Sequence, residues 1–162
     1  MPDVKLPVRH EPPASTARPH AADILVVALD DAGLAEALPV ALERACALGV
    51  NVTVAGRAKV PVWWALATSG MTFVPRVWVE DPRTASAAAL RDRVQRCAPG
   101  AECDVVCGTG RAERWLGRVL RTGAYGTVLV GAAHVSARRA RRLEAIAGPC
   151  RAFAVLKPLG PG

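Results

Sequence analysis

The sequence has few aromatic residues and very few lysines. Aromatic side chains make up 4% of the 162 residues, whereas hydrophobic residues make up 51%. A core of this composition has to be built from valine, leucine and alanine, which suits buried parallel strands. Eighteen of the 21 basic residues are arginine, and with 14 acidic residues the net charge is +7. Because arginine and alanine also accumulate in proteins from GC-rich genomes, the charge alone assigns no function.

The sequence places no catalytic constellation and no metal site. It contains five cysteines, an odd number, without a CxxC motif or a nearby histidine pair. Cys103 and Cys107 are four residues apart on one expected strand, so both should point to one face, toward the core. We expect reduced, mostly buried thiols in a cytoplasmic protein, and the alternative is a Cys-x3-Cys metal or redox pair. With no nucleophile placed near a base, we expect no catalytic residues and no enzymatic activity.

The chain divides into a tail and one domain. Residues 1–21 contain five prolines and no apolar segment typical of a secretory signal, and they are predicted to be a disordered tail. Residues 22–158 are predicted to form a single α/β domain. Residues 60–79 are apolar and include Trp63 and Trp64, but prolines and Arg76 interrupt them. We therefore expect a loop folded on the domain and no membrane span.

Short apolar strands alternate with amphipathic helices along the domain. Strands are expected at 23–30 and 51–56, and near 103–107, 127–131 and 152–156. The first helix should end near Leu48, before Gly49, and Pro39 either kinks it or marks its true first turn. Asp81 and Pro82 are a suitable start for the second helix. Strict alternation predicts a doubly wound parallel sheet with helices on both faces.

The helices show distinct buried and exposed faces. In the third helix, apolar residues recur with helical spacing, and arginines occupy the opposite face. The fourth helix starts near Ser136 and stops at Gly148–Pro149. The positions expected to point inward in the last three helices are Ala87, Leu90, Val94 and Cys97; Ala112, Trp115, Leu116, Val119 and Leu120; and Ala140, Leu143 and Ala147.

Four segments carry a resemblance to a known family: residues 24–30, 45–54, 127–131 and 148–156. In their order and spacing they resemble the universal stress protein family over residues 22–158. The resemblance implies a five-stranded parallel sheet of order 3-2-1-4-5, a Rossmann-like fold of the adenine-nucleotide alpha hydrolase type. It also implies a homodimer that pairs through the fifth strand, and a regulatory role in stress response.

The resemblance includes a nucleotide motif that this chain does not keep. In the nucleotide-binding branch of the family, strand four runs into G-x2-G-x9-G-[ST], whose glycines let main-chain amides approach phosphates. Here Gly131 matches the first glycine, but His134 and Glu144 stand at later glycine positions, and the loop is shorter. We expect the phosphate site to be lost and no cofactor to be required. The alternative is a residual ATP or AMP site formed by Asp30, Gly131 and His134.

Two further features of the carboxyl edge have more than one interpretation. Gly108-Thr-Gly110 opens a helix, but Glu113 occupies the third position of a dinucleotide fingerprint, so a tight turn is expected. His134 is either a plain loop residue or an acid–base group. The sequence favours neither dinucleotide binding nor catalysis at this edge.

The third and fourth helices together carry an arginine-rich surface. The right-handed crossover rule places both helices on the same side of a 3-2-1-4-5 sheet. This surface is either plain solvated protein or a docking site for nucleic acid or an acidic partner. Its members are Arg111, Arg114, Arg118, Arg121, Arg138, Arg139, Arg141 and Arg142. The leading hypothesis is a non-enzymatic regulatory protein with a degenerate nucleotide site, with a nucleotide-binding sensor or a nucleic-acid-associated protein as alternatives.

Overall fold

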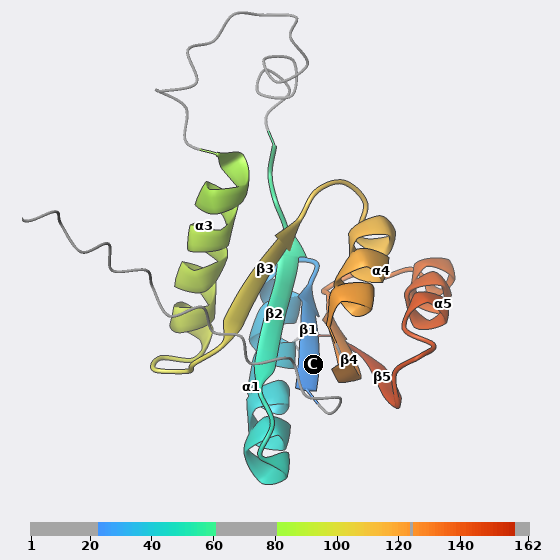
Figure 1. Ribbon diagram of the computed structural model, residues 1–162, viewed down its shortest axis with the longest axis horizontal. Helices are drawn as coiled ribbons and strands as arrows, with labels where there is room; N and C mark the ends of the chain where they lie inside the picture. Colours follow the sequence, from blue (N-terminus) through green and yellow to red (C-terminus); the bar gives the residue numbers. More distant parts are fainter. Residues whose placement is uncertain (1–22, 61–80, 124, 158–162) are drawn as a thin grey trace, which may run out of the picture.

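The computed structural model describes residues 23–60, 81–123 and 125–157, which form a parallel sheet between two helical layers (Figure 1). The strands are β1 (Asp23–Ala28), β2 (Val52–Arg57), β3 (Asp104–Gly108), β4 (Tyr125–Gly131) and β5 (Ala152–Leu156). The helices are α1 (Asp31–Leu48), α3 (Pro82–Cys97), α4 (Ala112–Thr122) and α5 (Ala137–Ile146). The predictions for the 1–21 tail and for Trp63 and Trp64 lie outside the described residues.

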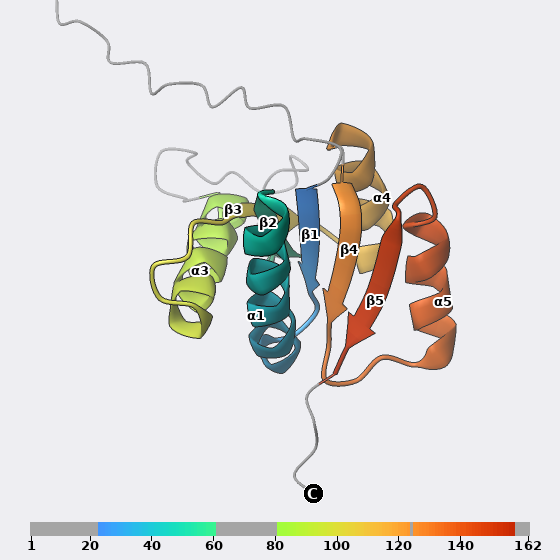
Figure 2. The ribbon, with the colours of Figure 1, turned by 90° about the horizontal axis from the view of Figure 1, so that it is seen from below.

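The predicted fold class and strand order are confirmed. The sheet has five strands in the order β3-β2-β1-β4-β5, and every neighbouring pair is parallel. All six residues of β1 are buried because this central strand is covered on both faces. Ile24 and Val26 pack into the cluster that includes α1 and α3, whereas Leu25 and Val27 pack into the cluster that includes α4 and α5. Figure 2 shows the two layers on opposite sides of the sheet.

The capped helix α1 leads from β1 back to β2. Asp30 is its N-cap, and Gly49 ends it in the left-handed conformation with φ 66°, a conformation that glycine adopts at little cost. Since the helix begins at Asp31, Pro39 lies well inside it and is not in its first turn. Leu38 before this position and Ala41 after it are fully buried, so tertiary packing holds the helix together through the proline.

The outer helices confirm most of the predicted buried positions. In α4, four of the five predicted residues are buried and Leu120 is half-buried. In α3, Leu90 and Val94 are buried, whereas Ala87 and Cys97 are half-buried. In and just after α5, Leu143 and Ala147 are buried, whereas Ala140 is half-buried. The half-buried positions belong to helices that cover the margins of the sheet, where fewer neighbours exclude water. Among the described residues, no helix is long and apolar enough to cross a membrane.

The expectation of mostly buried cysteines is wrong. Cys46 is exposed on α1, and the other four cysteines are half-buried. Cys103 and Cys107 do pack against the same side of the core, as their spacing predicted. They lie at β3, an edge strand that is covered less completely than β1.

Candidate functional site

The topological switch point of the sheet, where the strand order reverses direction, lies between β1 and β4. These strands are neighbours, and Ala28 of β1 pairs with Gly131 of β4 at their carboxyl ends. The Leu29 main-chain N–H then donates to the Gly131 carbonyl at 3.0 Å. Ligands of doubly wound proteins bind at this kind of edge. The structure therefore brings the predicted residues Asp30 and Gly131 to one place, with His134 in the loop that follows β4.

The Asp30 carboxylate is already engaged by main-chain donors of the protein. Its Oδ1 accepts the Gly33 N–H at 2.7 Å, which caps the first turn of α1. Its Oδ2 accepts the Ala133 N–H at 2.8 Å, from a loop 103 residues further along the chain. One half-buried side chain thus fastens the end of β1, the start of α1 and the loop after β4 to one another.

Backbone packing fills the space beside this carboxylate. A Cβ atom built on Gly131 would collide with the Gly33 carbonyl and would lie 3.0 Å from the Cβ of Ala37. A Cβ atom built on Gly33 would collide with the main chain of Gly131 and Ala132. Both glycines are therefore required for the close approach of α1 to β4. The sequence reasoning assigned Gly131 to phosphate approach, whereas in the structure it makes room for the first turn of α1.

The loop after β4 is anchored by the residues that follow His134. Val135 in this loop is buried, and Ser136 caps α5 by accepting the Arg139 N–H at 3.3 Å. His134 is exposed just before these two residues, and Glu144 is exposed on α5. The role of His134 as an acid–base or nucleotide-binding group therefore stays a prediction.

The arginine-rich surface is smaller than predicted by one residue. Arg139 is half-buried and its Nε lies 3.3 Å from Oε1 of Glu113, without hydrogen-bond geometry. The reason is helical spacing, because Arg139 lies four residues before the buried Leu143 and so shares its inward side. The other members are exposed on α4 and α5: Arg111, Arg114, Arg118, Arg121, Arg138, Arg141 and Arg142.

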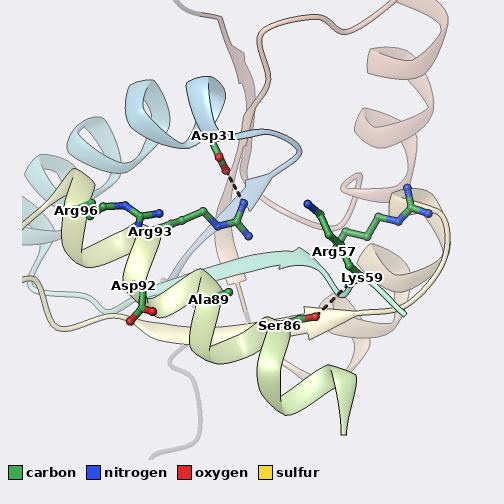
Figure 3. Close-up of a pocket in the computed structure, with 8 residues that line it drawn as sticks. All are labelled: Asp31, Arg57, Lys59, Ser86, Ala89, Asp92, Arg93 and Arg96. Atoms are coloured by element: carbon green, nitrogen blue, oxygen red, sulfur yellow. Dashed lines mark hydrogen bonds and ion pairs between the residues drawn. The ribbon is translucent and has the colours of Figure 1, made fainter. Parts of the chain in front are cut away.

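A concave site that the sequence reasoning missed lies between β2, α1 and α3. It is a cavity of about 300 Å³ with charged residues along its wall (Figure 3). Its charged members are Asp31, Arg57, Lys59, Asp92, Arg93 and Arg96. The available signal was the pair Arg57 and Lys59, at the end of a buried strand and just after it, at the carboxyl edge of the sheet. The basic residues of α3 were harder to find, because their helix shows no strongly apolar face.

No protein-family model and no curated protein matches this sequence. Solved structures are similar to this chain, and two of them are universal stress protein structures. One is a universal stress protein in complex with cAMP, 14% identical, with a TM-score of 0.49, over 86% of this chain and 100% of that chain. The other is a protein from the universal stress protein family from Burkholderia pseudomallei, 19% identical, with a TM-score of 0.46, over 83% of this chain and 96% of that chain.

Proposed function

We propose that this chain is a non-enzymatic regulatory protein of the universal stress type whose nucleotide site is degenerate. The observation that carries the proposal is the close packing of Gly33 against Gly131 and Ala132. The Asp30 carboxylate, which accepts the Gly33 and Ala133 N–H groups, holds the two segments together. A nucleotide at this edge would compete with a helix cap and a loop anchor that the fold uses itself. The substitutions His134 and Glu144 at the family's glycine positions support the same conclusion.

The proposal includes a cytoplasmic homodimer. The odd number of cysteines supports a reducing compartment. β5 lies at the edge of the described sheet, with half-buried apolar residues along its whole length. Edge strands of this kind are ready templates for pairing with a second chain. Light scattering after size-exclusion chromatography tests this, and a monomer at micromolar concentration would refute the dimer.

Calorimetric titration with ATP, AMP and cAMP tests the degenerate site. We expect no saturable binding in the micromolar range and no release of phosphate from ATP above the buffer rate. Amide chemical shifts of Gly33, Gly131 and Ala133 provide the site-specific readout, because these groups form the closed crevice. Micromolar binding that moves these amides would favour the alternative, a nucleotide-binding sensor of the same fold.

A second candidate function is docking of nucleic acid or an acidic protein. The observation that favours it is the exposed set of seven arginines on two adjacent helices, α4 and α5, with Glu113 withdrawn into its contact with Arg139. Such a surface attracts polyanions over a distance of about 10 Å at moderate salt. This candidate is compatible with a closed crevice, since it lies on the outer face of the helical layer.

A further inference from the structure

The cavity between β2, α1 and α3 has basic residues from two different elements. Arg57 is the last residue of β2, Lys59 follows it, and Arg93 and Arg96 extend from α3 (Figure 3). Asp31, the first residue of α1, lies on the other side. These residues meet because α1 and α3 cover the same face of β2 and β1.

The acidic residues of this cavity leave a cationic excess. Asp31 and Arg93 form an ion pair of 2.5 Å, so their charges offset each other. The Asp92 carboxylate points away from Arg93 and Arg96 in Figure 3. Within the described part of the chain, no ion pair engages Arg57, Lys59 or Arg96. Four cations and two carboxylates line this concave site, which leaves an excess of two positive charges whose field the low-dielectric walls focus.

A hydroxyl group, that of Ser86, also lies in the wall of the cavity. Ser86 Oγ accepts the Lys59 main-chain N–H at 3.1 Å. Since that bond uses a lone pair of the hydroxyl, its proton is available for an acceptor in the cavity. A guanidinium, an ammonium and a hydroxyl donor are the set that commonly binds phosphoryl oxygens.

We propose that this cavity binds a small phosphate ester, with the phosphoryl group held by Lys59 and Arg96. Its volume of about 300 Å³ is at the small end of the range for organic ligands, which fits a compact phosphorylated molecule. The site lies on the β2 side of α1, whereas the closed crevice lies on its β4 side. The inference therefore stands apart from the proposed function, and either can fail alone.

The Asp31–Arg93 pair is positioned to tune this affinity. A phosphoryl group in the cavity would compete with the Asp31 carboxylate for the Arg93 guanidinium, and the Asp31 carboxylate would repel it. Removing that carboxylate charge should release Arg93 to the ligand. Asp31→Asn is consequently expected to tighten phosphate binding severalfold, the opposite of what loss of a merely structural ion pair would do.

Calorimetric titration of the full chain with inorganic pyrophosphate, at constant ionic strength, tests the proposal. We expect saturable binding that weakens about tenfold in the double variant Lys59→Gln, Arg96→Gln and strengthens in Asp31→Asn. The matched control is Arg44→Gln, Arg151→Gln, which removes the same charge away from the cavity and from the arginine-rich surface and should leave the affinity unchanged. All the substituted residues are exposed, so thermal melting should show the fold intact.

Three results would overturn the proposal: absence of saturation, equal weakening in both double variants, or no gain in Asp31→Asn. The readout is distinct from the crevice. Amide shifts on pyrophosphate addition should concentrate at Lys59 and Ser86, with Gly131 and Ala133 unmoved.

Discussion

The main-chain carbonyl of Gly33 lies directly against Gly131, with no side-chain carbon between α1 and the end of β4. This contact decides how the carboxyl edge can be used. A glycine at this place in a doubly wound fold is commonly interpreted as a phosphate-approach position. Here the approaching group is the protein's own helix, and the Asp30 carboxylate binds the main-chain amides on both sides of the contact.

Gly131→Ala should destabilise the domain by about 1–3 kcal/mol, because the added methyl group would be forced into the Gly33 carbonyl. Urea unfolding followed by circular dichroism provides the measurement. The matched control is Gly117→Ala in α4, whose new Cβ would lie 3.7 Å from Ile146 Cγ2, in ordinary contact. The control should stabilise the protein by about 0.5–1 kcal/mol, because alanine favours helix. Equal effects of both substitutions would contradict the close packing described here.

Asp30→Ala should cost more than Asp81→Ala, although each residue caps a helix. Loss of a cap costs about 1 kcal/mol, and among the described residues the Asp81 side chain accepts the Arg83 N–H alone, in its own turn. Asp30 also accepts the Ala133 N–H, so its removal leaves a second donor unpaired, for about 1 kcal/mol more. Hydrogen exchange at Ala133 should accelerate in Asp30→Ala alone. Unchanged exchange there would show that the loop is held by other contacts.

The half-buried cysteines should make stability fall in alkali. Burial raises the pKa of the Cys103 and Cys150 thiols. Burial also raises the pKa of the Cys107 thiol, although the nearby Arg93 and Arg91 charges act to lower it. The folded state therefore favours the protonated thiols. Their contribution is complete below the ordinary thiol pKa, about 9, and is lost as the pH rises through the raised values. Urea unfolding between pH 8 and about 11 checks this, with Cys103→Ala, Cys107→Ala as the comparison, which should show a smaller decline. A decline of the same size in the variant would disprove the assignment.

If the arginine-rich surface binds nucleic acid, its affinity should fall steeply with salt. Each arginine that contacts a phosphate contributes about 0.9 to the slope of log affinity against log salt. Removing three of them should reduce the slope by up to about 3. The variant is Arg138→Gln, Arg141→Gln, Arg142→Gln, and the control of equal charge is Arg44→Gln, Arg83→Gln, Arg91→Gln on the opposite layer. Fluorescence anisotropy with duplex DNA at several salt concentrations distinguishes them, and equal slopes would assign the surface to solvent.

The sheet could be predicted because its signals are local. Each strand is a short apolar run of residues such as Val and Leu, and the helix ends carry Asp30, Gly49, Asp81 and Ser136 as caps. Alternation of strands and helices then leaves few topologies. The burial of the cysteines was overestimated because position in the sheet, central or edge, depends on long-range pairing.

The chemistry of the edge could not be predicted in the same way. Asp30 and Gly131 were found, but the sequence does not show that Gly33 packs against Gly131 or that the Ala133 N–H donates to Asp30. Those contacts join residues about a hundred positions apart. Arg139 was misplaced because four arginines in five positions hide which one shares the side of Leu143. The cavity beside α3 was missed because it combines the end of one strand with two helices.

The most direct test of the closed crevice is a titration of the Lys59→Gln, Arg96→Gln variant with ATP, followed by calorimetry and by the amide shifts of Gly33, Gly131 and Ala133. This variant removes the basic cavity as an alternative anion site and leaves the crevice intact. The account predicts no saturable heat at micromolar protein and unmoved amides. Saturable micromolar binding that shifts these three amides would contradict it.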